Sequence, residues 1–171
     1  MFDNKYENVC PACGEKMVKV YMPNQKVNLD VCLNGCGGIY FDNREFEKFD
    51  EVHEDIAPLL EAYKGKTFKK ADESQTRICP VCGMQMVKNF SSAKKEVQID
   101  ECYRCGGRFL DYSELEKIRA EYPNENARAE AAIELLYKEA GSELAVFRAQ
   151  YGKYKKNPSM LTRLHDLFSG N

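Results

Sequence analysis

The sequence predicts a small α+β protein: two tandem copies of a four-cysteine unit, followed by an α-helical C-terminal region. Each unit should contain a β-hairpin, a third short strand and a short helix. Three observations lead to this prediction. The 171-residue chain places all eight of its cysteines in two segments, 10–49 and 79–118. Apolar and polar residues alternate around a polar turn between the cysteine pairs, and apolar residues recur at helical spacing after residue 123.

The first unit opens with a Cys-Pro-Ala-Cys-Gly turn at residues 10–14. A mixed apolar and charged pattern over 17–22, a Pro-Asn-Gln turn at 23–25 and strict alternation over 27–31 predict a hairpin. The hairpin would bring the first cysteine pair close to the second in space. A third apolar piece follows at 39–41.

Each unit ends in a helix-start signal. Asp42-x-x-Glu45 and Asp111-x-x-Glu114 resemble capping boxes, with Asp at the N-cap and Glu at N3. Short helices are therefore expected to follow in both units. The side chains expected to pack inward from them are Phe46, Phe49, Leu115 and Ile118.

The second unit repeats the first at a constant offset, which pairs Cys10 with Cys79. The copies slip by one position in the turn and realign at Cys36 and Cys105. One inserted residue causes the slip and another restores the alignment, and both lie where a turn can absorb them. The repeat therefore indicates an internal duplication, and the strand expected over 84–90 is the counterpart of the strand over 17–22.

The remaining segments connect or follow the units. Residues 56–63 are expected to form a helix with Pro58 near its start, and the polar run 64–77 a flexible linker. Residues 124–151 are rich in Ala, Glu, Leu and Arg and should be helical, with Gly141 dividing the segment into two helices. The predicted domains are the first four-cysteine unit at 1–50, a helix and linker at 51–78, the second four-cysteine unit at 79–119 and a helical C-terminal region at 120–171.

The cysteine spacing predicts metal sites. In both units a CxxC is followed by a second cysteine pair, and the gap between the pairs is the one found in four-cysteine zinc ribbons. Zn²⁺ takes four thiolates tetrahedrally, and a site without an open position is structural. We therefore expect two four-cysteine zinc ribbons with one Zn²⁺ each. The predicted ligands are Cys10, Cys13, Cys32, Cys36, Cys79, Cys82, Cys102 and Cys105.

One cysteine pair departs from the pattern. Cys32 and Cys36 form a CxxxC, in which Gly35 is expected to supply the wider turn. The two histidines, His53 and His165, lie outside both units and are expected to be surface or packing residues.

The chain is predicted to be cytoplasmic. No apolar signal segment follows Met1, and no apolar run is long enough to span a bilayer. Thiols stay reduced in the cytosol, where CxxC pairs bind metal or perform redox chemistry.

The charge balance disfavours a nucleic-acid partner. The formal charge is −2, and two tetrathiolate zinc sites would move it to about −6. A phosphate backbone prefers a basic surface. The basic clusters at 64–70 and 153–156 are expected to be solvated surface.

With these motifs in place, the chain resembles the bacterial zinc-ribbon family of transcription factor IIB type. The second unit carries the resemblance at 79–83, 99–102, 105–107, 110–111 and 114–117. The first unit matches at Leu29-Asp30 and Phe41-Asp42 and departs at its CxxxC. The resemblance covers about half of the chain and implies zinc binding.

Three functions follow from these observations. The first is a non-catalytic zinc-binding module that binds a protein partner, through the apolar stripe Met160–Phe168 if that stripe does not pack on this chain's own helices. The second is binding to nucleic acid or the transcription machinery, to which Tyr40, Phe90 and Tyr103 could contribute stacking, although core or metal-shielding roles are expected for them. The third is a rubredoxin-like iron site or a thiol redox switch.

An enzyme is not predicted. The sequence shows no Ser/His/Asp set, no phosphate-binding glycine loop and no metal site with an open position.

Overall fold

The computed structural model describes the backbone of residues 8–151 and the side chains of residues 8–141. The chain divides into two compact units, Met1–Ala129 and Glu130–Asn171. The first contains both cysteine repeats. The apolar stripe Met160–Phe168 lies outside the described residues.

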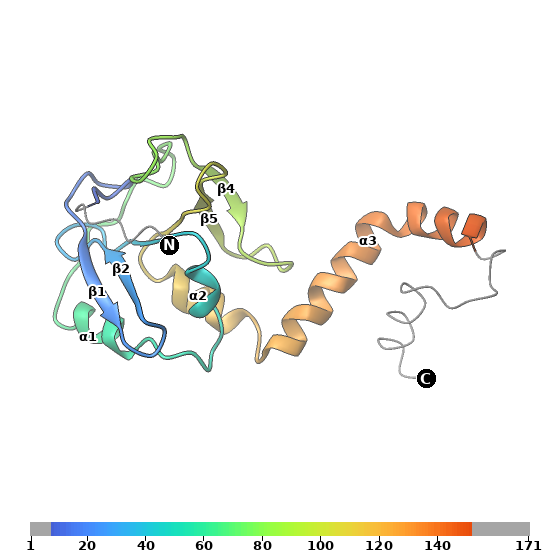
Figure 1. The fold of residues 1–171 in the computed structure, drawn as a ribbon, viewed down its shortest axis with the longest axis horizontal. Helices are drawn as coiled ribbons and strands as arrows, with labels where there is room; N and C mark the ends of the chain where they lie inside the picture. The colour runs from blue at the N-terminus through green and yellow to red at the C-terminus, as the bar shows by residue number, and fades with distance from the viewer. Residues whose placement is uncertain (1–7, 152–171) are drawn as a thin grey trace. The chain divides into compact units, whose positions relative to one another are not determined.

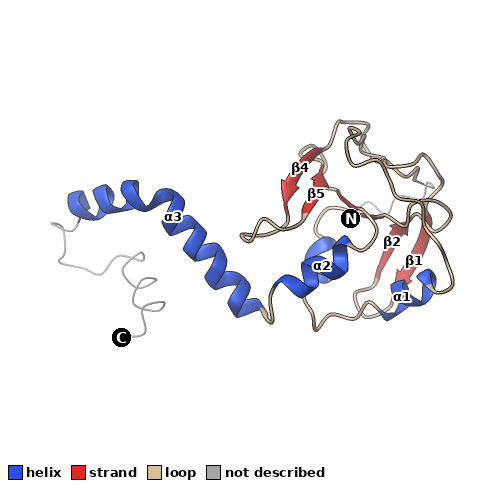
Figure 2. Cartoon of the chain, turned by 180° about the vertical axis from the view of Figure 1, so that it is seen from behind, coloured by secondary structure: helices blue, strands red, loops and turns tan. Residues whose placement is uncertain are grey.

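The two repeats form one six-stranded antiparallel sheet (Figures 1 and 2). The first ribbon supplies β1 (Val18–Met22), β2 (Val27–Val31) and β3 (Ile39–Phe41). The second supplies β4 (Val87–Phe90), β5 (Gln98–Glu101) and β6 (Arg108–Leu110). The strand order is β1-β2-β3-β6-β5-β4, so the third strand of each ribbon lies at the centre.

The ribbons join through β3 and β6. Ile39 pairs with Leu110, Tyr40 with Phe109, and Phe41 with Arg108. Tyr40 and Phe109 occupy the same position in the repeat, and here they face each other. The duplication has therefore placed the two ribbons about a local twofold at the centre of the sheet.

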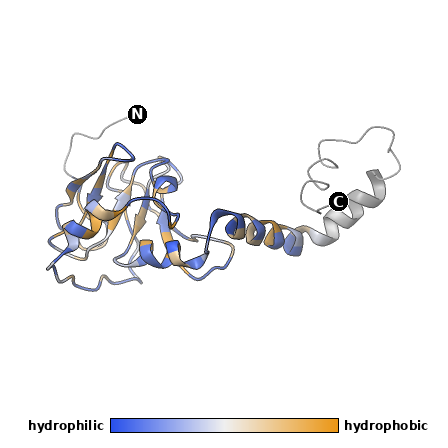
Figure 3. Cartoon of the chain, turned by 90° about the horizontal axis from the view of Figure 1, so that it is seen from below, coloured by the Kyte–Doolittle hydropathy of each residue, from blue (hydrophilic) through white to orange (hydrophobic). Residues whose placement is uncertain are grey.

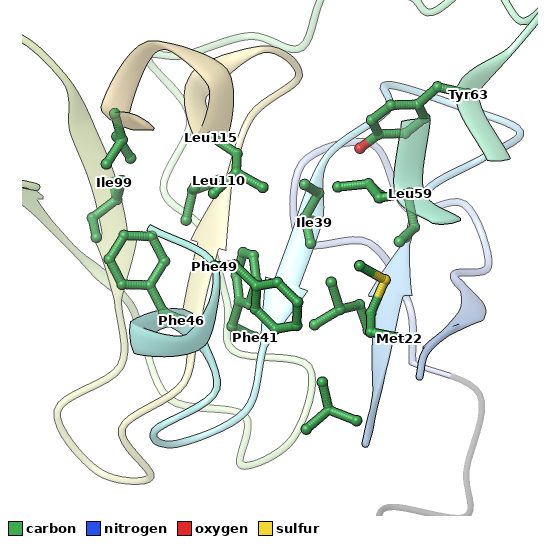
Figure 4. Packing of buried hydrophobic residues seen from close by; sticks show 14 of the residues in the cluster. Met22, Ile39, Phe41, Phe46, Phe49, Leu59, Tyr63, Ile99, Leu110 and Leu115 are labelled. Atoms are coloured by element: carbon green, nitrogen blue, oxygen red, sulfur yellow. The ribbon is translucent and has the colours of Figure 1, made fainter. Parts of the chain in front are cut away.

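One face of the sheet carries a core shared by both ribbons. Phe41, Phe46 and Phe49 of the first ribbon pack with Leu110 and Leu115 of the second (Figure 4). Figure 3 shows the same concentration of apolar residues on the strands. The inward packing expected for Phe46, Phe49, Leu115 and Ile118 is confirmed.

The opposite face holds the sulfurs. Successive side chains on a strand alternate between faces. Tyr40 and Phe109 therefore leave the shared core, and they pack with cysteines of both repeats and with Met17 and Met86.

The helix starts differ from the expected capping boxes. The Glu45 and Glu114 carboxylates accept the backbone N–H groups of Asp42 and Asp111, as a capping box requires. However, the residues before the two glutamates have φ values of 66° and 70°. This left-handed turn delays the helix, so α2 is Glu114–Glu121 and the first ribbon has only a 3₁₀ turn, Phe46–Lys48.

Two other expectations concern the connecting segments. Helix α1, Ala57–Tyr63, confirms the helix over 56–63. Helix α3 runs without interruption from Glu125 to Tyr151, so the division at Gly141 was wrong. A single glycine costs a helix only about 1 kcal/mol, which its Ala- and Leu-rich neighbours can offset. Among the described residues, no helix is sufficiently long and apolar to cross a bilayer.

The linker prediction needs a correction. Residues 64–77 contain no helix or strand, but Phe68 packs on Tyr63 and Tyr112, with ring centroids 5.1 and 4.8 Å away. Arg77, at the end of the segment, has a side chain with 0% exposure. The polar composition concealed these two anchors, because each depends on a contact with a distant part of the chain.

The close approach of the ribbons yields a stability prediction. A Cβ on buried Gly107 would overlap the Tyr40 hydroxyl and lie 2.5 Å from Cζ of its ring. We therefore expect Gly107→Ala to lower the free energy of unfolding of the zinc-loaded protein by about 1–3 kcal/mol, the usual cost of overpacking. Guanidinium chloride titration measures it. Gly141→Ala, which meets no heavy atom within 4 Å, is the control and should not destabilise. An unchanged midpoint for Gly107→Ala would refute the close packing of Tyr40 on this glycine.

Candidate metal centres

The first centre gathers the four cysteines of the first ribbon. Cys10 Sγ lies 3.5 Å from Cys36 Sγ, and Cys13 Sγ lies 3.4 Å from Cys32 Sγ. All four sulfurs lie within 4.8 Å of one another. The hairpin of β1 and β2 thus brings together two pairs that are distant in the sequence, including Cys32 of the unusual CxxxC.

The second centre repeats this arrangement. Cys79 Sγ lies 3.5 Å from Cys105 Sγ, and Cys82 Sγ lies 3.3 Å from Cys102 Sγ. These four sulfurs also lie within 4.8 Å of one another.

The sulfur spacing fits tetrahedral zinc. With Zn–S bonds of about 2.3 Å, the sulfurs of a tetrahedron lie about 3.8 Å apart. The observed distances of 3.3–3.5 Å and the limit of 4.8 Å bracket this value. Among the described residues, each group consists of cysteines alone. Two four-cysteine sites, one in each ribbon, are therefore consistent with two Zn²⁺ ions per chain.

Each ribbon has two cysteine-bearing turns, here called its first knuckle (residues 10–14 and 79–83) and its second knuckle (residues 32–37 and 102–106). The backbone of the first knuckle explains the glycine that follows its second cysteine. The Gly14 N–H donates to the Cys10 carbonyl at 2.9 Å, and the Gly83 N–H donates to the Cys79 carbonyl at 2.9 Å. Both glycines adopt positive φ, 77° and 70°, a backbone conformation that glycine takes without strain.

The second knuckle shows how the extra residue of the first ribbon is accommodated. In the second ribbon the Gly106 N–H donates to the Cys102 carbonyl four residues earlier, whereas in the first the Gly37 N–H donates to Cys32 five residues earlier. Gly35 does not take a positive φ. A Cβ there would lie 2.7 Å from Cys13 Sγ, so this glycine leaves room for the sulfurs.

In the second ribbon, hydrogen bonds at the second knuckle lower the pKa of one of its two cysteines. Burial raises the pKa of Cys102, but hydrogen bonds from the Cys105 N–H, the Cys82 thiol and the Arg104 N–H outweigh burial and lower the pKa to about 7. The turn therefore favours the deprotonated form of Cys102, whereas burial raises the pKa of Cys105 to about 12.

Tyr40 reaches from the first ribbon to the sulfurs of the second. Its hydroxyl lies 3.3 Å from Cys79 Sγ and 3.7 Å from Cys105 Sγ. Burial and the nearby Cys79 raise its pKa, so the hydroxyl keeps its proton at neutral pH. The core or metal-shielding role expected for Tyr40 is thus confirmed, whereas Phe90 and Tyr103 are 48% and 71% exposed and do not fill that role.

A buried carboxylate lies next to the second cysteine pair of each ribbon. Asp30 accepts hydrogen bonds from Asn8 and Lys19, at 2.8 and 3.1 Å. Its repeat counterpart, Asp100, faces Arg77 at 3.8 Å and Lys88 at 3.4 Å.

Arg77 also pairs with Asp111, at 3.3 Å. Arg77 stands at the repeat position of Asn8, so the network differs most between the copies at residues 8 and 77. Sequence reasoning missed Arg77, although its position two residues before Cys79 matches that of Asn8 before Cys10.

Near this network, Glu114 is held in an unusual state. Burial raises the pKa of its carboxyl, the Asp111 N–H opposes this effect, and the Asp111 carboxylate adds to it, which gives a value of about 7. The Glu114 carboxyl is therefore about half protonated at neutral pH in the folded protein, where a glutamate in solution is ionised.

An open groove of about 630 Å³ lies between the first knuckles of the two ribbons. Val9 and Ile78, which occupy equivalent positions in the repeat, line it and are each 51% exposed. Pro11 and Pro80 line it as well, together with sulfur-bearing residues such as Cys13. No lysine or arginine of the described residues is among those that line the groove.

The histidine of the described residues, His53, is not part of a metal centre. His53 is exposed and belongs to neither sulfur group, in agreement with the surface role expected for it. His165 lies outside the described residues.

Comparison with known proteins supports the zinc assignment. A family model described as a transcription factor zinc-finger, the zinc ribbon of transcription factor IIB, matches residues 9–51 and 78–121. The two matches together cover more than half of the chain. No curated protein and no solved structure matches the chain.

The CxxxC knuckle yields a prediction about zinc content. If Cys32 is a ligand, Cys32→Ser should reduce the zinc bound per chain from two ions to one, because a three-thiolate site binds Zn²⁺ less tightly. Elemental analysis of the dialysed protein measures the ratio. Leu33→Ala, in the same knuckle, is the control and should keep both ions. Two zinc ions in the Cys32→Ser protein would exclude this cysteine as a needed ligand.

Glu114 yields a prediction about pH. Its pKa rises from 4.5 to about 7 on folding, so the stability it contributes is present below about pH 4.5 and is lost as the pH rises through 7. Glu114→Gln keeps an acceptor for Asp111 but does not ionise. Relative to wild type, the variant should gain about 1–2 kcal/mol of unfolding free energy between pH 5 and pH 8.

Urea titrations of both zinc-loaded proteins across this range measure the difference. Zinc loss at low pH affects the two proteins alike, so it cancels in the comparison. A difference that stays constant with pH would show that Glu114 ionises normally.

Proposed function

The chain belongs to the transcription factor zinc-finger family, and from this premise we propose that it is a non-catalytic zinc-binding module that mediates a protein–protein interaction. A cytoplasmic location is part of the proposal, because reduced thiols are needed to hold the metal. The eight cysteines would act as the zinc ligands, four in each centre.

The groove between the first knuckles is the observation that carries this proposal. Val9 and Ile78 present apolar side chains to solvent at equivalent positions on its two sides. Exposed apolar side chains on the two sides of a groove can both contact one apolar side chain of a partner. The groove therefore supports an apolar anchor of a partner between the ribbons.

The walls of the groove are suited to binding. Each wall is a knuckle held by a metal centre and by short backbone hydrogen bonds, such as Cys10 N–H to Glu15 at 2.8 Å and Cys79 N–H to Met84 at 2.8 Å. A rigid surface loses little conformational freedom when a partner binds. Zinc thiolates would also make the groove negative, which favours a basic residue beside the apolar anchor.

The composition of the groove weighs against nucleic acid. Arginine and lysine supply most contacts to phosphates. The described residues that line the groove include neither. Tyr103 and Phe90 are exposed on the second ribbon and could stack on bases, but they do not line the groove.

The double variant Val9→Asp/Ile78→Asp tests the proposal. Tagged wild-type chain should retain a protein partner when isolated from its own cells, and the double variant should lose it, because two charges would occupy the apolar site. With purified partner, the affinity should fall by about tenfold or more. Val52→Asp, at another exposed valine, is the control and should bind normally.

Two further measurements separate the alternatives. A chain ending at Lys156 that loses the partner, while the double variant keeps it, would assign the contact to Met160–Phe168 instead of the groove. Recovery of nucleic acid without any protein would contradict the proposal and favour the second function. Both variants must first be shown to bind two zinc ions.

A further inference from the structure

The hydroxyl of Tyr40 lies above two sulfurs of the opposite ribbon. Tyr40 belongs to β3, the strand that follows the first metal centre, and its side chain is almost entirely buried. Its oxygen is 3.3 Å from Cys79 Sγ and 3.7 Å from Cys105 Sγ. Those two sulfurs are 3.5 Å apart, so one hydroxyl contacts the edge of the sulfur group that faces the sheet.

The chemistry of the centre decides the direction of these hydrogen bonds. A cysteine bound to zinc is a thiolate and has no proton to donate. The Tyr40 O–H is therefore the donor, shared between the sulfurs of Cys79 and Cys105. A hydrogen bond withdraws electron density from a thiolate, which lowers its reactivity towards protons and electrophiles.

The first centre has a different neighbour at the equivalent place. Phe109 occupies the repeat position of Tyr40 and pairs with it across the centre of the sheet. Its ring lies against Gly38, just as Tyr40 lies against Gly107. Phe109 has no hydroxyl, so it cannot return the hydrogen bond to the sulfurs of the first ribbon.

We infer that Tyr40 is a positioning residue of the second zinc centre: the first ribbon donates a hydrogen bond that shields the Cys79 and Cys105 thiolates and slows the loss of their zinc. The two centres of the duplicated chain are then chemically unequal. The second centre depends on the first ribbon for part of its protection, and the first centre receives none from Phe109.

The test compares Tyr40→Phe with wild type in the full zinc-loaded chain. N-ethylmaleimide labels each cysteine, and peptide mass spectrometry gives the rate for each site. Without the hydroxyl, Cys79 and Cys105 should react about tenfold faster, the lower end of the effect of residues that support metal ligands. The rates at Cys10 and Cys36 should not change.

Tyr63→Phe is the matched control. Tyr63 is also buried, and its hydroxyl donates to the Gly37 carbonyl at 2.7 Å instead of to a sulfur. It therefore reports the general cost of removing a buried tyrosine hydroxyl. It should not accelerate labelling selectively at Cys79 and Cys105.

A spectroscopic measurement separates a bond to sulfur from a packing effect. In the Co²⁺-substituted protein, the sulfur-to-cobalt charge-transfer band reports the electron density on the thiolates. Tyr40→Phe should shift this band to lower energy, whereas Tyr63→Phe should leave it in place.

Two results would overturn the inference. Equal acceleration at all eight cysteines would show that Tyr40 only stabilises the fold. Unchanged labelling rates together with an unchanged charge-transfer band would show that the hydroxyl does not act on the thiolates.

Discussion

The pairing of β3 with β6 is the interaction on which the rest of the structure depends. Each ribbon is a sheet of three short strands and is too small to bury an adequate core alone. By joining at their third strands, the ribbons turn two incomplete faces into one core, in which Phe41 of the first ribbon and Leu110 of the second are both fully buried. Arg108 adds a polar link, because it pairs with Glu47 at 2.6 Å and lies over the Phe46 ring.

The same pairing links the core to the metal centres. Because neighbouring residues on a strand face opposite sides, Tyr40 and Phe109 must lie on the sulfur face whenever Phe41 and Leu110 lie in the core. Both ribbons carry a glycine where the opposite aromatic ring passes, Gly38 and Gly107. The second glycine of each Cys-Gly-Gly run is therefore explained by contact between ribbons. The metal centre of one ribbon and the β-strand of the other form a single packed unit.

Charge is distributed around the centres in a way that differs between the copies. Asp30 is neutralised by Lys19 and bonded by Asn8, whereas Asp100 and Asp111 surround Arg77, whose side chain is fully buried. A buried arginine must be paired, because an unpaired charge in the interior is costly. The groove between the knuckles, by contrast, is lined without any lysine or arginine of the described chain. The surface proposed to bind a partner thus differs in character from the charged interior beside it.

The sequence alone determined the local features: the eight cysteines in two groups, the hairpins and the inward side chains of the short helices. These follow from ligand spacing, from alternation and from turn residues, all of which act over a few residues. The tertiary structure alone decided the features that join distant segments. The role of Tyr40 requires Cys79, the burial of Arg77 requires Asp100 and Asp111, and the delayed helix starts require left-handed backbone at Arg44 and Ser113. No periodicity marks such residues, because each is specified by a partner that the fold, and not the order of the chain, brings next to it.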